Sequence, residues 1–231
     1  MKYKNSNSEK LDFPKAIYAK SSLIIIFFSF SLMACNALFN TANKTPKKSY
    51  VATIYTKFGQ IDLLLFDKTP KHRDNFIKLI EEDFYDSTTF HRVLDNFMIQ
   101  GGDPNSKPNA SAEVGTGGPG YTIESEILEG YKHNRGMLAA ARKGDRVNPE
   151  RASSGSQFYI VQNESGAHHL DGAYTIFGTV LNGLDVVDEI ASVTVDRKGK
   201  PEEVVRMSIS VKKMKRKNIS PDSIWLISLT A

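Results

Sequence analysis

Apolar residues gather in several short stretches of this chain that read as β-strands, and in one of them apolar and polar residues alternate. Residues 51–57 and 60–66 read as two such strands, with a turn at positions 58–59 where a glycine follows a phenylalanine. A strand with one buried face is also expected from residue 205 to residue 211, where every second residue is apolar.

Other stretches are apolar without alternation or are mainly polar. We expect a strand region over residues 89–100 and buried core strands over residues 136–141 and 157–161. Residues 105–120 are rich in Gly, Pro, Ser and Asn, and residues 142–155 are polar, so both read as long loops. Loops of this length inside compact domains are usually functional.

Two helices are expected among these strands. Thr69 offers an N-cap and Pro70 suits the first helical position, so a helix begins there, with the apolar residues between 76 and 80 on one face. Residues 185–191 show a second helical spacing of apolar positions. Many short strands with only two helices favour a closed β-barrel over a doubly wound sheet.

The composition is that of an ordinary globular protein and excludes several kinds of partner. The chain has 231 residues, of which 40% are hydrophobic and 24% charged, and its net charge is +4. Residues 1–34 contain five Lys and two acidic residues, so they contribute three of those four charges. The remainder is nearly neutral, which argues against nucleic acid as a partner. The single cysteine, Cys35, excludes an internal disulfide and a thiolate zinc site.

The N-terminus is typical of a targeting segment. Residues 1–34 contain a basic region followed by twelve largely apolar residues, 23–34, a run too short to span a membrane but suited to a signal peptide. The four residues that end at Cys35, LMAC, resemble a bacterial lipobox, which implies a lipid on Cys35. The alternative is a plain secretory signal with an incidental cysteine. Residues 35–48 are polar and read as a flexible tether of about 45 Å at full stretch.

The globular domain is expected over residues 49–217 and a tail of unknown role over residues 218–231. Residues 212–217 include five basic side chains, and residues 224–227 are apolar. We interpret this end as a solvated charge run followed by a segment packed on the domain. A contact with a partner or with a membrane surface is the alternative.

Four segments, in this order, resemble the cyclophilin family of peptidyl-prolyl cis/trans isomerases. They are residues 90–103 (FHRVLDNFMIQGGD), 136–141 (GMLAAA), 154–160 (SGSQFYI) and 170–178 (LDGAYTIFG). The resemblance covers roughly residues 50–211. It implies a mainly β fold, a closed eight-stranded antiparallel barrel capped by two α-helices, in agreement with the pattern above.

The chemistry of prolyl isomerisation needs few groups. Rotation about a peptide bond has a barrier of about 18–20 kcal/mol because nitrogen shares its lone pair with the carbonyl. A fixed cation that donates a hydrogen bond to the nitrogen of the twisted bond, beside an apolar slot for the ring, would lower that barrier without proton transfer. Arg92 suits the donor role because it stays charged and offers a rigid fork of N–H groups. The resemblance implies Arg92, Phe97 and Gln100 as the catalytic residues.

The same resemblance implies the substrate-binding positions. They are Met98, Ala141, Arg142, Gln157, Tyr159, Leu170, Tyr174 and His169. Arg142 stands where the family commonly has Asn, and His169 stands where cyclosporin-sensitive members have Trp. The adjacent His168 and His169 have no evident third ligand, so we expect no metal and no cofactor.

The resulting hypothesis is a lipid-anchored isomerase of the bacterial cell envelope, facing the periplasm or the exterior. It would speed the folding of exported or envelope proteins by rotating X-Pro bonds. Its partners would be proline-containing polypeptide segments, with no nucleic acid, and it would be a monomer held to the membrane through Cys35. The alternative function is a scaffold or chaperone that binds proline segments with little turnover.

Overall fold

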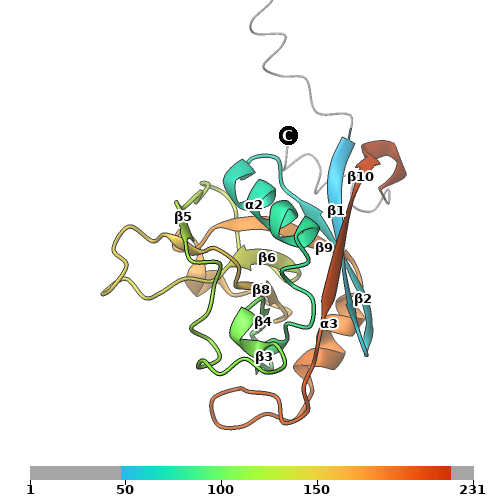
Figure 1. The fold of residues 1–231 in the computed structure, drawn as a ribbon. Coiled ribbons are helices and arrows are strands. Elements are labelled where there is room, and N and C mark those ends of the chain that lie inside the picture. Colours follow the sequence, from blue (N-terminus) through green and yellow to red (C-terminus); the bar gives the residue numbers. More distant parts are fainter. Residues whose placement is uncertain (1–47, 220–231) are drawn as a thin grey trace, which may run out of the picture. The chain divides into compact units, whose positions relative to one another are not determined.

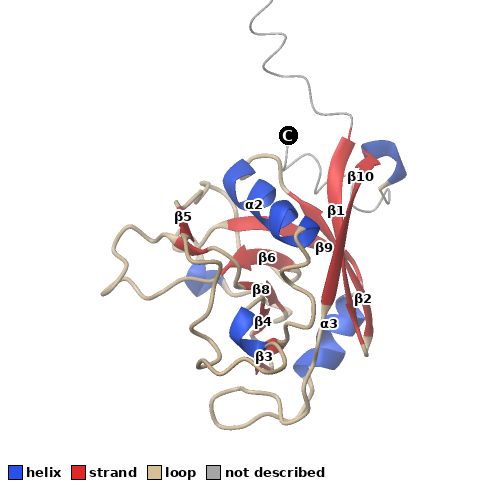
Figure 2. Cartoon of the chain, viewed as in Figure 1, coloured by secondary structure: helices blue, strands red, loops and turns tan. Residues whose placement is uncertain are grey.

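The structure, a computed structural model, describes residues 48–219, and its centre is one curled antiparallel sheet (Figures 1 and 2). The eight strands are β1 (Lys48–Thr56), β2 (Gly59–Leu65), β3 (Phe90–Leu94), β4 (Met98–Gly101), β6 (Met137–Ala140), β8 (Phe158–Val161), β9 (Ile176–Asn182) and β10 (Ser208–Lys215). They follow the order β10-β1-β2-β9-β6-β8-β4-β3, and β5 (Thr122–Ile123) pairs separately with β7 (Ser153–Ser154). The predicted mainly β fold with eight antiparallel strands is confirmed.

The two outer strands of that order, β3 and β10, are joined through the residues that precede them. The amide of Ser87 donates to the carbonyl of Met207 at 3.0 Å, and the amide of Met207 donates to the carbonyl of Thr88 at 2.8 Å. The amide of Phe90 donates to the carbonyl of Val205 at 2.9 Å. These bonds satisfy backbone groups that an open sheet edge would leave free, and they hold the curl together.

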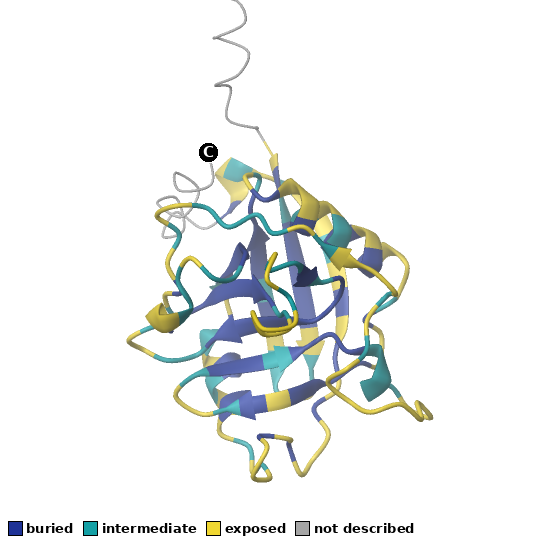
Figure 3. Ribbon diagram, turned by 90° about the vertical axis from the view of Figure 1, so that its left-hand side faces the viewer, coloured by how far each residue is buried: buried dark blue, intermediate teal, exposed yellow. Residues whose placement is uncertain are grey.

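Two α-helices cover the curled sheet, α2 (Pro70–Glu81) and α3 (Leu184–Ala191), as expected. Phe76 and Ile80 of α2 and Val187 and Ile190 of α3 enter the same buried core, which lies inside the curl (Figure 3). Three short 3-10 turns complete the fold, η1 (Pro104–Ser106), η2 (His168–Leu170) and η3 (Arg216–Asn218). Between residues 48 and 219, none of the helices combines the length and the hydropathy needed to cross a membrane.

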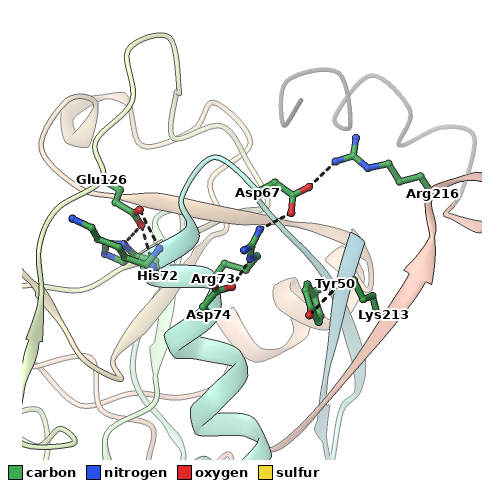
Figure 4. Close-up of polar contacts among 9 residues, drawn as sticks. Tyr50, Asp67, His72, Arg73, Asp74, Glu126, Lys213 and Arg216 are labelled. Atoms are coloured by element: carbon green, nitrogen blue, oxygen red, sulfur yellow. Dashed lines mark hydrogen bonds and ion pairs between the residues drawn. The ribbon is translucent and has the colours of Figure 1, made fainter. Parts of the chain in front are cut away.

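The start of α2 differs from the prediction. Thr69 stands at the N-cap position, but its side chain makes no capping bond. Glu126, from a distant loop, instead accepts the backbone N–H groups of Lys71 at 3.1 Å and His72 at 3.0 Å, and it also contacts Nδ1 of His72 at 2.7 Å (Figure 4). A carboxylate is well placed there because free N–H groups and the helix dipole make a helix N-terminus electropositive.

The strand region expected over residues 89–100 is a hairpin. β3 ends at Leu94 and β4 begins at Met98, and the turn between them contains Asn96 with a φ of 56°. Asparagine tolerates this left-handed conformation better than most residues. The turn places Arg92 directly opposite Gln100 on the neighbouring strand.

Candidate active site

The β3–β4 hairpin brings Arg92 and Gln100 together. Nη1 of Arg92 donates to Oε1 of Gln100 at 3.3 Å, across the two paired strands. Arg92 is exposed and Gln100 is half-buried, so the guanidinium stays accessible while one of its donors is held. The arrangement leaves the remaining N–H groups of Arg92 available to a ligand.

A second amide fixes the orientation of Gln100. Nε2 of Gln157 donates to the carbonyl oxygens of Gly115 at 3.1 Å and Gly117 at 2.8 Å. Because carbonyl oxygens only accept, the other end of the Gln157 amide is its oxygen, which accepts from Nε2 of Gln100 at 3.1 Å. The oxygen of Gln100 therefore faces Arg92, and each amide in this chain has one consistent orientation.

The loop that supports Gln157 is itself tied to the fold by Asp103. This fully buried carboxylate accepts the amide of Asn105 at 2.7 Å and the amide of Gly117 at 3.3 Å, and it also accepts the amide of Gly115. A side chain at position 117 would place its Cβ 2.1 Å from Asp103, so only glycine fits there. The loop holds Gln157, which holds Gln100, and Gln100 in turn bonds to Arg92. The conformation of the loop therefore helps to fix the position of Arg92.

A pocket of about 110 Å³ with apolar and polar walls lies beside Arg92. Its lining comes from the β3–β4 hairpin and its turn, from β8 and η2, and from the segments that follow β6 and η2. It consists of Arg92, Phe97, Met98, Gln100, Ala141, Arg142, Tyr159, Leu170 and Tyr174. Met98 and Tyr159 are buried, whereas Phe97 and Leu170 are partly exposed. The pocket therefore joins apolar side chains to the guanidinium groups of Arg92 and Arg142.

A buried histidine that the sequence reasoning missed holds the floor of this pocket. The ring of His133 is fully buried, and its Nδ1 lies 2.9 Å from a carboxylate oxygen of Asp171. Its Nε2 lies 3.0 Å from the hydroxyl of Tyr159. Burial lowers the pKa of His133, which favours the neutral ring, and a carboxylate only accepts. We therefore assign the ring proton to Nδ1, and Nε2 accepts from Tyr159.

The loop after β6 closes one side of the pocket. The guanidinium of Arg142 lies over the ring of Tyr174, 4.4 Å from its centroid, and Nε donates to the carbonyl of Ala173 at 2.8 Å. Asp145 pairs with Arg142 at 2.5 Å and with Arg151 at 3.3 Å. The side chain of Arg142 is only 4% exposed, so its charge is compensated within the wall of the pocket.

Comparison with known proteins agrees with this geometry. The family described as "Cyclophilin type peptidyl-prolyl cis-trans isomerase/CLD" matches residues 51–211. The chain belongs to the cyclophilin family. Its enzyme class is accordingly that of the peptidyl-prolyl cis-trans isomerases, EC 5.2.1.8.

Several cyclophilin relatives are similar over most of the described residues. A peptidyl-prolyl cis-trans isomerase of Acinetobacter baylyi is 34% identical over 195 residues, 82% of this chain and 92% of that protein. One of Arabidopsis thaliana is 37% identical over 158 residues, 68% of this chain and 91% of that protein. The isomerase-like 2 protein of Rhizopus delemar is 42% identical over 171 residues, but the match spans only 29% of its length. The first two consist almost entirely of the matched region, so a cyclophilin domain of this size folds as an independent unit.

Solved cyclophilin structures give the same result. A cyclophilin-type isomerase of Cryptosporidium parvum matches with a TM-score of 0.63 and 30% identity, over 71% of this chain and 98% of that one. A second structure of that protein, in the presence of the dipeptide Ala-Pro, matches with a TM-score of 0.62 and 29% identity, over 70% of this chain and 98% of that one.

Most residues predicted for the cyclophilin site meet in the structure, and two of them, Gln157 and His169, do not line the pocket. Gln157 does not line the pocket but holds Gln100. His169 is exposed outside the pocket, with its ring 5.3 Å from that of Phe97. Cys35 lies outside the described residues. Between residues 48 and 219, no three His, Cys, Asp or Glu side chains are grouped as a metal ion would require.

Asp171→Asn is expected to destabilise this cyclophilin in a pH-dependent way. Burial alone would raise the pKa of Asp171, but hydrogen bonds from His133 and His168 outweigh it and lower the pKa to about 2. Because this lies below the usual value of about 3.9, the stabilisation is present above about pH 4 and is lost as the pH falls from about 4 toward 2. At neutral pH the variant should lose about 2 kcal/mol of unfolding free energy.

Urea denaturation between about pH 3 and pH 7 measures this effect. The difference between wild type and Asp171→Asn should shrink as the pH falls. The matched control is Asp86→Asn, at an exposed carboxylate that pairs with no described cation. A difference that stayed constant down to pH 3 would show that the hydrogen bonds to Asp171 do not stabilise the fold.

Proposed function

We propose that Arg92 donates a hydrogen bond to the prolyl nitrogen of a substrate whose ring occupies the adjacent pocket. As the peptide bond twists, the nitrogen lone pair leaves conjugation and becomes an acceptor. A donor aimed at that nitrogen stabilises the twisted state more than either planar isomer, so it lowers the barrier. The observation that carries the proposal is the guanidinium of Arg92, held by Gln100 on the edge of that pocket.

The other pocket residues receive binding roles in this proposal. Phe97, Met98, Tyr159 and Leu170 form the apolar surface that receives the prolyl ring. Gln100 orients Arg92 and contacts the substrate backbone, with Gln157 behind it. Ala141 and Arg142 are assigned to the substrate residue before proline, and the ring of Tyr174 closes the pocket. The related structure with the dipeptide Ala-Pro supports a prolyl ligand.

The competing function is a scaffold that binds proline segments with little turnover. A protease-coupled assay on residues 48–231 separates the two, since the protease cleaves only the trans isomer and reports the rate of exchange. An isomerase shortens an exchange that takes tens to hundreds of seconds without a catalyst. A scaffold would bind the peptide and leave that rate unchanged. The presence of both Arg92 and Gln100 in hydrogen-bond contact favours the isomerase.

We also propose that the protein acts in the bacterial cell envelope as a lipid-anchored monomer. The support is the sequence of residues 1–35, a basic and apolar signal followed by the only cysteine of the chain. A lipid on Cys35 would hold the catalytic domain near the membrane through the tether of residues 36–48. Its substrates there would be exported or envelope proteins that fold with X-Pro bonds.

Replacing Cys35 with Ser is expected to release the protein from membranes, because Ser has no thiol to accept a lipid. Membrane pellets and supernatants are compared by immunoblot, and radiolabelled palmitate reports lipidation directly. Asn40→Ala, in the tether, is the control and should remain in the pellet. Palmitate incorporation that persisted in Cys35→Ser would overturn the anchor assignment.

A further inference from the structure

The strand pairing gathers positive charge at one end of the sheet. β1 and β10 are antiparallel, so the first residues of β1 face the last residues of β10 (Figure 1). Lys48 pairs with Lys215, Tyr50 with Lys213, and Val51 with Lys212. We call the exposed lysines gathered there the basic strand end, which consists of Lys48, Lys212, Lys213, Lys215 and Lys217.

Acidic side chains do not neutralise this cluster. β1, β10 and η3 contain no Asp or Glu. The ion pairs found between residues 48 and 219 involve none of the five lysines. Asp67 lies nearby, but Arg73 contacts it at 2.6 Å and Arg216 at 2.8 Å (Figure 4). The excess of positive charge is therefore available to an anionic partner.

One flank of the cluster faces a groove beside α2. Lys48 and Lys213 line this groove together with residues of α2, among them Asp74 and Glu81. Asp74 forms an ion pair with Arg73 at 2.7 Å, so the negative charge of Asp74 is already neutralised by an arginine. The other three lysines of the basic strand end, Lys212, Lys215 and Lys217, do not line the groove, and all three are exposed.

Packing on both faces of β10 gives the cluster a fixed position. Nζ of Lys213 lies 4.6 Å from the ring centroid of Tyr50 and donates to its hydroxyl at 3.3 Å. On the opposite face, Met214 packs against an apolar cluster that contains Val51 and Ile219. These contacts on both faces of β10 hold the strand in place, so the basic strand end keeps a fixed position relative to the rest of the domain.

We infer that the basic strand end is a docking surface for anionic phospholipid headgroups. The inference rests on the proposed envelope location, because β1 directly follows the tether of about 45 Å from Cys35 and so lies within its reach of the bilayer. Clustered Lys residues near a bilayer strengthen binding to anionic lipid several-fold each. The anchor would raise the local lipid concentration, so even weak individual contacts become effective. No residue that lines the pocket beside Arg92 belongs to β1 or β10, so docking leaves that pocket free.

Vesicle cosedimentation of residues 48–231 tests the inference without the anchor. The protein should bind vesicles of equal parts phosphatidylglycerol and phosphatidylcholine, and not vesicles of phosphatidylcholine alone. Raising the salt from about 0.02 M to about 0.5 M should abolish binding. Replacement of Lys212, Lys213, Lys215 and Lys217 by Gln should weaken binding at least about tenfold, with isomerase activity unchanged.

The matched control replaces four other exposed lysines by Gln, namely Lys57, Lys143, Lys198 and Lys200, and should retain binding despite the same loss of charge. Equal binding by the two quadruple variants would overturn the inference, and so would wild-type protein that binds heparin but no vesicle. Cys35 lipidation is measured separately by palmitate incorporation. A lipidated chain whose domain ignores anionic vesicles would refute this inference and leave the anchor proposal standing.

Discussion

Arg92→Ala is expected to lower kcat/KM for a prolyl peptide at least about a hundredfold, which corresponds to about 2.7 kcal/mol. The loss should fall on kcat, because the bond from Arg92 to nitrogen forms only as the substrate twists. Peptide affinity should change little, since the apolar surface of the pocket remains. The protease-coupled assay measures both parameters when the peptide concentration is varied.

Two controls separate this loss from unfolding. Arg92 is exposed and makes one side-chain hydrogen bond, of 3.3 Å, so the variant should unfold at the same urea concentration as wild type. Arg197→Ala, at an exposed arginine outside the pocket, should keep full activity. Arg92→Lys should recover only part of the rate, because ammonium keeps the charge but lacks the planar fork. Near-normal activity in a folded Arg92→Ala protein would rule out the proposed role.

His169→Trp is expected to strengthen inhibition by cyclosporin by about a hundredfold. The change adds roughly 60–100 Å² of apolar contact area, equivalent to about 1.5–2.5 kcal/mol. An indole hydrogen bond adds about 1 kcal/mol, and each 1.4 kcal/mol is a factor of about ten in affinity. Turnover should change little, because His169 is exposed beside Phe97 and does not line the pocket.

An inhibition titration of wild type and variant under one set of conditions measures this difference. Ser165→Trp places an indole elsewhere on the same exposed loop and should leave inhibition unchanged. Equal and tight inhibition of wild type and His169→Trp would show that position 169 does not govern the drug site in this protein.

The sequence predicted those features that depend on local pattern or on long matched motifs. Alternation from residue 205 to residue 211 identified a half-buried strand, and Val205, Met207 and Ile209 are buried, although β10 itself begins at Ser208. The family motifs predicted the pocket residues from four separate parts of the chain, which no periodicity relates. Helix α2 begins at Pro70, as predicted, and α3 begins at Leu184, one residue before the predicted range 185–191.

The features that were missed depend on contacts between distant segments. Glu126 contacts the start of α2 from more than fifty residues away, so a rule based on neighbouring residues assigned the cap to Thr69. His133 lies in a loop without periodic pattern, and only the fold brings it to Tyr159 and Asp171. Asp171 lies in the matched motif of residues 170–178, but the motif does not indicate that Asp171 bonds to a histidine outside it.

Exchange NMR on residues 48–231 with a proline peptide tests the central claim most directly, because one sample reports binding and turnover together. Chemical shifts of pocket residues such as Phe97 and Leu170 report binding, and exchange cross-peaks of the peptide report the isomerisation rate. We predict shift changes in the pocket together with cis–trans exchange far faster than the uncatalysed tens to hundreds of seconds. Shift changes in the pocket with exchange at the uncatalysed rate would contradict the account and identify the domain as a binding scaffold.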